Sequence, residues 1–238
     1  MNNQKEYHIR RSQRARRARI VVTADKVEVV VPLRMPEKQI QQFMRAKQSW
    51  IDAAKNKVQQ HVDNIASFAP ESYQHGALIP YLGKQYRLQI KVSQEKRIKI
   101  ALEQDFIAYV PETLKGSALN EQVRIALLSW MGQAAAEQAR TTMEHYAPLY
   151  QLSPRSIVIK TQKSRWGSCG IHNDIHLNWL LILAPAEVFE YVVIHELCHI
   201  EQRNHSAAFW ALVARHCPDY KQRRLWLKQN GASLMLGL

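Results

Sequence analysis

Residues 185–205 read PAEVFEYVVIHELCHIEQRNH and contain the pattern His-Glu-x-x-His between His195 and His199. Two histidines four positions apart on an α-helix lie about 40° apart around its axis and about 6 Å apart along it. Their imidazoles can therefore reach one metal ion, and Glu196, which points elsewhere, can reach a water molecule bound to that ion. The stretch predicts a zinc site on a helix, with Glu196 as general base.

The residues before the two histidines support a helix over this stretch. Phe189 and Val192 recur at helical spacing, which is typical of a half-buried helix. Pro185 suits the first helical turn, and Glu187 and Glu190 suit the positive end of the helix dipole. A structural pair of histidines is the alternative, and we favour the metal site.

A third metal ligand is indicated by elimination. Some zinc peptidases take a glutamate from a later helix, but this chain has no Glu after Glu201. His205 is therefore the strongest candidate, and its distance from His195 matches that in another zinc peptidase group, the metzincins. His216 and Asp219 are weaker alternatives.

The position of His205 requires the helix to end soon after His199. On an unbroken helix, six further residues would turn His205 roughly 120° away from the metal face. We expect Arg203–Asn204 to end the helix, with the asparagine in the left-handed conformation, and Ser206 to cap the next helix.

Several segments in this order resemble the YgjP-like and SprT-like metallopeptidases, a bacterial zincin family. The resembling residues are Lys163–Cys169 (KSRWGSC), Ile175–Trp179 (IHLNW), His195–His199, Asn204–Ser206, Phe209–Trp210, the Arg-rich opening and Tyr81–Lys84. The resemblance covers nearly the whole chain. It implies zinc ligands at His195, His199 and His205 and a general base at Glu196, in agreement with the reasoning from the residues.

The composition indicates which cell compartment and which partners to expect. Three cysteines without a C-x-x-C pair are typical of a reducing compartment, and we expect the protein to be cytoplasmic. The first 19 residues lack the apolar core of a signal peptide, and no apolar run reaches the roughly 20 residues of a membrane span. We therefore expect no membrane partner.

The formal net charge is +13, and six arginines lie between Arg10 and Arg19. This Arg stripe could bind nucleic acid or nucleotides through their phosphates. The alternative is the solvated face of a strand, because Arg17 and Arg19 alternate with Ala18 and Ile20. No aromatic residues are interleaved with the arginines, so base stacking is not indicated.

The order of patterns predicts an α+β chain. Its β-rich N-terminal half carries one helix, and its C-terminal half is a zincin-like region with a small sheet and the H-E-x-x-H helix. We expect a basic N-terminal region at 1–115 and a metallopeptidase region at 116–238, or one continuous domain. The expected strands are 18–23, 27–32, 86–92, 96–102, 106–110, 157–160 and 175–180. The expected helices are 36–61, 121–146, the motif helix after Pro185, a helix after Ser206, and one from Asp219 to about Lys228 that stops near Gly231.

The leading functional prediction is a zinc-dependent hydrolase, a metallopeptidase in which Glu196 activates the zinc-bound water. The expected substrate is a protein or peptide, which would pair with a strand at Ile175–Leu180, with Lys163 or Arg165 at the rim of the cleft. One alternative is a metal-dependent phosphohydrolase acting on nucleotides, although no Gly-rich phosphate loop occurs. Another is a nucleic-acid-associated protease or binding module that uses the Arg stripe.

Overall fold

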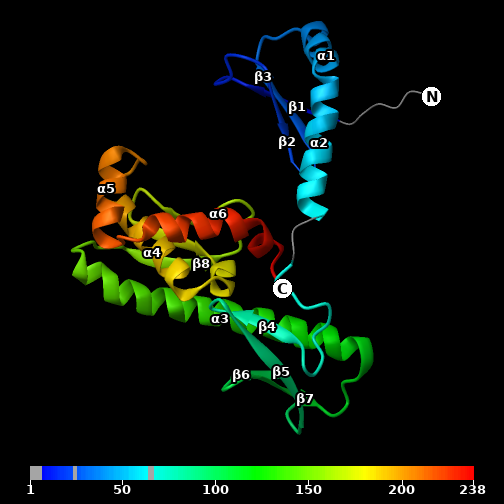
Figure 1. The fold of residues 1–238 in the computed structure, drawn as a ribbon, viewed down its shortest axis with the longest axis vertical. Coiled ribbons are helices and arrows are strands. Elements are labelled where there is room, and N and C mark those ends of the chain that lie inside the picture. Colours follow the sequence, from blue (N-terminus) through cyan, green and yellow to red (C-terminus); the bar gives the residue numbers. More distant parts are fainter. Residues whose placement is uncertain (1–6, 24–25, 64–66) are drawn as a thin grey trace. The chain divides into compact units, whose positions relative to one another are not determined.

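The computed structural model describes residues 7–23, 26–63 and 67–238. The chain divides into two units, Met1–Ile65 and Ala66–Leu238, which are described separately. The α+β fold class is confirmed, with strands concentrated in the first half and helices in the second (Figure 1). The expected boundary after residue 115 stays a prediction.

The first unit contains a three-stranded sheet with the order β1-β3-β2. Strands β2 (Arg19–Val22) and β3 (Val27–Pro32) are antiparallel, as predicted, and β1 (Tyr7–Ser12) adds a parallel pairing to β3. The sequence analysis missed β1 because its side chains are mostly exposed and show no apolar alternation. The predicted strands 18–23 and 27–32 imply a turn at residues 24–26, most of which lies outside the described residues.

Two helices replace the single helix predicted over 36–61. They are α1 (Glu37–Ala46) and α2 (Gln48–Asp63), and the break falls at Lys47. Ile40 and Met44 from α1 and Ile51 from α2 pack on the buried residues of β3. Trp50 of α2 does not share this packing, because it is 52% exposed.

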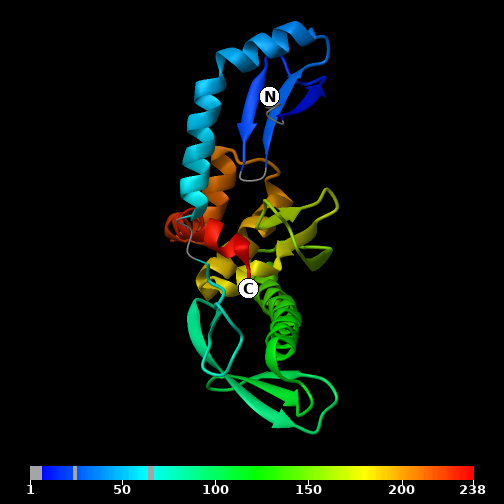
Figure 2. The ribbon, with the colours of Figure 1, turned by 90° about the vertical axis from the view of Figure 1, so that its right-hand side faces the viewer.

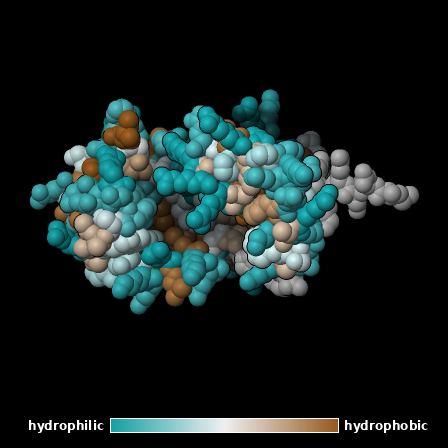
Figure 3. Space-filling view, turned by 90° about the horizontal axis from the view of Figure 1, so that it is seen from above, coloured by the Kyte–Doolittle hydropathy of each residue, from teal (hydrophilic) through white to brown (hydrophobic). Residues whose placement is uncertain are grey.

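Part of the Arg stripe is engaged within the first unit. Arg10 pairs with Glu28 at 3.3 Å. Arg11 donates to the carbonyl oxygens of Leu33 and Met35, at 3.0 and 2.7 Å. The ion pair of Arg10 and the hydrogen bonds of Arg11 favour a structural role for at least two of the six arginines. Hydrophilic residues dominate the face drawn in Figure 3.

The second unit is arranged around one long helix, α3 (Gly116–Leu149). A four-stranded sheet lies on one side of α3, and the other elements of this second unit lie on the opposite side (Figures 1 and 2). The four strands of this sheet are β4 (Leu78–Tyr81), β5 (Lys84–Ser93), β6 (Lys99–Leu102) and β7 (Phe106–Pro111). Across the sheet they lie in the order β4-β5-β7-β6. Phe106 meets Trp130 of α3 edge-on at 5.0 Å, so aromatic contacts fix the sheet on the helix.

The turn between β4 and β5 connects this sheet to the segment before the motif helix. Leu82 and Gly83 both have positive φ, 45° and 75°, which suits a two-residue hairpin turn. The Leu82 N–H donates to the carbonyl of Ile182 at 2.7 Å. A Cβ on Gly83 would lie 2.8 Å from Cα of Pro185, so only glycine allows this close approach.

A second small sheet has the order β8-β10-β9, formed by β8 (Ser156–Lys160), β9 (Gly167–Cys169) and β10 (Asp174–Asn178). The prediction that Ile175–Leu180 receives a peptide along its edge was wrong. Strand β10 is central and pairs with β8 and β9 on its two sides. The 3-10 helix η1 (Trp179–Leu183) follows it in place of the strand end expected near Leu180.

Three helices complete the second unit. Helix α4 (Ala186–Glu201) carries the H-E-x-x-H residues and follows Pro185, close to the prediction. Helix α5 (Ala207–His216) is capped by Ser206, whose Oγ accepts from the N–H of Phe209 at 3.4 Å. Among the described residues, no helix has the length and apolar character needed to span a membrane.

Two predictions about helix ends were wrong. Asn204 is not in the left-handed conformation, and its Oδ1 instead accepts from the N–H of Ser206. Helix α6 (Tyr220–Leu236) runs through Gly231 rather than ending there. This glycine packs against Trp166, since a Cβ would lie 3.3 Å from the indole ring.

Candidate metal centre

Three histidines of the second unit lie close together, two of them on α4 and the third in the segment that follows it. One nitrogen from each of His195, His199 and His205 lies within 4.8 Å of the other two. Nε2 of His195 is 3.1 Å from Nε2 of His205. Zinc–nitrogen bonds of about 2.0–2.1 Å at tetrahedral angles place two ligand nitrogens about 3.3 Å apart. The spacing of these two nitrogens therefore suits a single ion.

Neighbouring groups orient two of the three rings. Nδ1 of His199 lies 2.9 Å from the carbonyl oxygen of Gln202, and a carbonyl only accepts, so this nitrogen carries the proton. Nε2 of His199 is then free to bind a metal. The hydroxyl of Tyr191 lies 3.5 Å from Nδ1 of His195, on the side away from His205. The ring of Phe209 stacks on His199 at 4.4 Å.

Burial lowers the pKa of two of the imidazoles, those of His195 and His199. It lowers the pKa of His195 to about 3, with smaller contributions from His199, His205 and Arg224. Burial also lowers the pKa of His199. Because only the neutral imidazole donates a lone pair to a metal, both rings are ready to bind at neutral pH.

The carboxyl of Glu196 is buried and has one unpartnered oxygen. The residue is only 5% exposed, and its Oε2 has no hydrogen-bond partner among the described residues. Burial raises the pKa of Glu196 to about 8. A nearby cation would lower this pKa and stabilise the carboxylate. The orphaned oxygen and the three free imidazole nitrogens together fit a divalent metal with an open coordination position.

Gly167 allows strand β9 to approach this carboxyl. A Cβ on Gly167 would lie 2.5 Å from Oε1 of Glu196 and 2.7 Å from its Cγ. No side chain fits between the strand and the carboxyl, so glycine is required here. Glycine at 167 is therefore a part of the site that pattern analysis alone did not single out.

A cleft of about 400 Å³ opens next to Glu196 and His195. Its other lining residues are Ser164, Arg165, Trp166, Gly167, Tyr191, Val192, Arg224, Leu227 and Lys228. Arg165 thus lies at the cleft, as one of the two predicted alternatives, whereas Lys163 is not among its lining residues. A larger hollow, of about 1110 Å³, lies beside β5 and the start of α3 and contains none of the three histidines.

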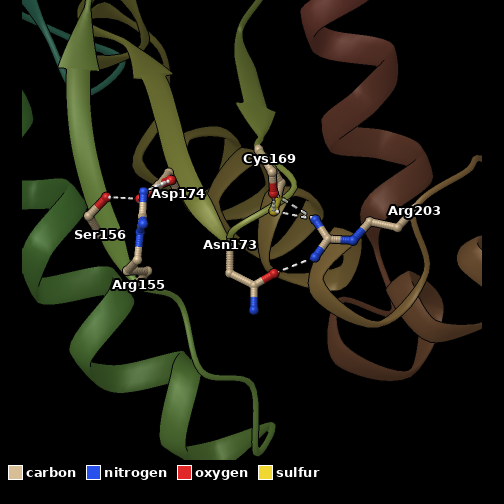
Figure 4. Close-up of polar contacts among 7 residues, drawn as sticks. Arg155, Ser156, Cys169, Asn173, Asp174 and Arg203 are labelled. Carbon is tan, nitrogen blue, oxygen red and sulfur yellow. Dashed lines mark hydrogen bonds and ion pairs between the residues drawn. The ribbon is translucent and has the colours of Figure 1, made fainter.

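Arg203 ties the segment that carries His205 to the β9–β10 hairpin. Its guanidinium donates to the carbonyl of Gly170 at 2.8 Å, to Sγ of Cys169 at 3.5 Å, and to Oδ1 of Asn173. Figure 4 shows the arginine reaching across to both sides of this turn. These bonds hold the chain reversal after α4 in place, and with it the third imidazole.

We expect Arg203→Ala to weaken metal binding about 10-fold, because the loop that holds His205 loses its contacts to the hairpin. The measurement is competition with a chromogenic chelator. Arg155→Ala is the matched control, since Arg155 pairs with Asp174 in the same hairpin without contacting that loop. Equal metal affinity in the two variants would contradict the positioning role of Arg203.

His205→Ala should reduce metal affinity more than about 100-fold, beyond the effect of losing an outer contact. His216→Ala is the control, because the sequence also allowed His216 as third ligand. In the structure His216 stacks on Tyr150 at 3.7 Å and is not part of the histidine group. A loss of metal in His216→Ala but not in His205→Ala would overturn the assignment.

A protein-family comparison agrees with a peptidase site. The YgjP-like family (YgjP-like, metallopeptidase domain) matches residues 16–230, and the chain belongs to this family. No curated protein matches the chain. A solved structure, the metallopeptidase zymogen abylysin of Pyrococcus abyssi, is 20% identical, covers 38% of this chain and 95% of its own, and has a TM-score of 0.33.

The family membership makes the protein a metallopeptidase-type hydrolase that uses a metal ion. The resemblance stated from the sequence is thereby confirmed. The assignment of individual ligands and of the base stays a prediction.

Proposed function

We propose that the protein is a zinc-dependent peptidase in which His195, His199 and His205 hold the ion and Glu196 is the general base. The observation that carries this proposal is the buried carboxyl of Glu196, whose Oε2 has no partner among the described residues, together with three converging imidazoles. A structural zinc site would normally have four protein ligands, whereas three leave a position open for chemistry.

Each residue has a defined task in this proposal. The ion, when bound, supplies Lewis acidity toward the scissile carbonyl and toward water. Glu196 takes a proton from the attacking water at its carboxylate and passes it to the leaving amine. Tyr191 is a neutral neighbour, because burial raises its pKa to about 12, and its hydroxyl orients His195.

Strand β9 is the best candidate for aligning an extended peptide. It is an edge strand, paired only with β10 among the described strands, and Gly167 brings its backbone next to Glu196. A peptide that adds to this edge would present its backbone to the carboxyl. We therefore propose that the peptide pairs with β9, instead of with β10 as the sequence suggested.

Metal removal and replacement tests the proposed function. The purified protein should contain about one zinc per chain, cleave members of an unbiased peptide library, lose cleavage after chelation and regain it with zinc. Cleavage that survives complete metal removal, as verified by elemental analysis, would overturn the proposal.

A second candidate is hydrolysis of a nucleotide polyphosphate. The specific observation in its favour is the positive charge of the cleft, where Arg165, Arg224 and Lys228 lie beside Glu196. A panel of nucleoside triphosphates, assayed in parallel with the peptide library, separates the two candidates. Metal-dependent release of phosphate or pyrophosphate without any peptide cleavage would favour the phosphohydrolase.

The nucleic-acid hypothesis has less support. It rests on the Arg stripe, in which Arg10 and Arg11 already have partners within the chain. It stays a prediction, and a steep salt dependence of duplex binding would be the observation in its favour.

A further inference from the structure

Three cationic side chains line the cleft beside the candidate base. Arg165 precedes β9, and Arg224 and Lys228 lie one turn apart on α6. Glu196 is the one acidic residue among the lining residues. The cleft therefore has an excess of positive charge close to the position where a substrate bond would be cut.

Arg224 is held in place by an aromatic ring. Its guanidinium carbon lies 4.5 Å from the centroid of the Trp210 ring, a cation–π contact. Trp210 in turn lies 5.7 Å from the rings of both His195 and His205, and it stacks on Tyr220. This contact places the arginine next to the histidine group.

The N–H donors of Arg224 have no acceptor in the described part of the chain. In the described residues, the side chain of Arg224 has no hydrogen bond and no carboxylate partner, and the side chains of Arg165 and Lys228 have none either. The neighbouring Arg223 is different, because it pairs with Asp219 at 2.8 Å and with Glu190 at 3.3 Å. The two adjacent arginines of α6 therefore differ: Arg223 forms ion pairs within the fold, whereas the donors of Arg224 face the cleft without such a partner.

We propose that Arg224, Lys228 and Arg165 form an anion subsite that binds a carboxylate of the peptide substrate next to the scissile bond. The inference rests on the proposed peptidase function and names the substrate class for it. The carboxylate is either an Asp or Glu side chain or the free C-terminus of the peptide.

The size and the chemistry of the cleft favour this occupant. A volume of about 400 Å³ accommodates one or two amino-acid residues. A planar guanidinium offers two parallel N–H donors that match the two oxygens of a carboxylate. A bound carboxylate would also relieve the repulsion among three like charges that the fold leaves uncompensated.

The test compares matched peptides on the zinc-loaded enzyme. Starting from a cleaved peptide, three changes are made separately: Glu to Gln near the cut, amidation of the C-terminus, and Glu to Lys. The expected result is a loss of about 10- to 100-fold in kcat/KM when the responsible carboxylate is removed, the range for one charge-assisted hydrogen-bonded pair. Glu to Gln and amidation distinguish the side-chain source from the terminal one.

Substitutions of Arg224 test whether this residue causes the preference for peptides that carry the carboxylate. Arg224→Gln should abolish most of the preference, Arg224→Lys should retain part of it, and Arg224→Glu should shift the preference toward the Lys peptide. Lys221→Glu is the control for Arg224→Glu. Lys221 lies on the same helix outside the cleft, and the two substitutions change the net charge by the same amount. An equal change in Lys221→Glu would show a long-range charge effect and overturn the subsite.

A binding measurement provides a readout other than turnover. In zinc-loaded Glu196→Gln protein, calorimetry should give tighter binding of the acidic peptide than of its amide counterpart, and the difference should disappear in Glu196→Gln/Arg224→Gln. Inorganic phosphate serves as the competing probe. Displacement of phosphate by nucleotides but not by acidic peptides would overturn the carboxylate assignment.

The two proposals fail in distinguishable ways. If the wild-type enzyme cleaves no peptide under any metal condition, the proposed function fails. If it cleaves acidic and neutral peptides with equal kcat/KM, the peptidase stands and the anion subsite is wrong.

Discussion

Glu196→Gln is expected to retain zinc and to lose about 10²- to 10⁴-fold in kcat, the range for removal of a general base. The amide is nearly isosteric with the carboxyl and does not accept a proton at neutral pH. The imidazoles of His195, His199 and His205 are unchanged, so metal content should stay near that of the wild type. Elemental analysis and initial rates on the same preparation make the measurement.

The same substitution has a second effect in the metal-free protein. Burial raises the pKa of Glu196 from 4.5 to about 8. The folded state therefore disfavours the charged carboxylate, and its stability falls as pH rises from about 4.5 to about 8. Glu196→Gln removes this dependence, so the metal-free variant should unfold at a higher temperature than the wild type at pH 8 and at a similar one at pH 4.

Glu187→Gln is a suitable control, because Glu187 lies in the first turn of the same helix, away from the histidines. It should retain both activity and metal. Wild-type turnover in the Glu196→Gln variant would contradict the assigned base. Loss of metal in that variant would instead show that this carboxyl is a ligand.

Gly167→Ala should reduce kcat about 100-fold while metal binding is maintained. The added methyl would lie 2.5–2.8 Å from Oε1, Cγ and Cδ of Glu196, distances that real structures do not tolerate. Either strand β9 or the carboxyl must move, and a displacement of about 1 Å in a reacting group costs on the order of 10² in rate.

Gly170→Ala is the matched control for Gly167→Ala. It lies in the same hairpin, and its Cβ would meet nothing closer than 3.5 Å. Thermal unfolding should show both variants folded, with the rate loss confined to Gly167→Ala. Equal rates in the two variants would mean that the close approach of β9 to Glu196 has no part in turnover.

The sequence predicted the motif helix and its surroundings because local chemistry decides them. Pro185 lies just before α4, and Ser206 caps α5 through a bond to its own chain three residues later. His205 was selected by elimination, and the helix end after His199 is the local feature that allows it to approach the other two histidines. Such features depend on residues that are near one another in the chain.

Features that depend on distant residues could not be predicted in this way. The central position of β10 results from its pairing with β8 and β9, and single-strand patterns do not reveal strand order. Helix α6 passes through Gly231, where the indole ring of Trp166, 65 positions earlier, packs against the glycine. The role of Gly167 against Glu196 is likewise a contact between separate elements.

Strand β9 contains only three residues, Gly167–Cys169. An extended chain that lies along so short an edge gains few main-chain hydrogen bonds, since each strand residue contributes at most two and alternate residues point them to opposite sides. Long unfolded segments would then be bound no more tightly than tripeptides through this edge. Discrimination between one cut position and another must therefore depend mainly on the side chains that enter the neighbouring cleft.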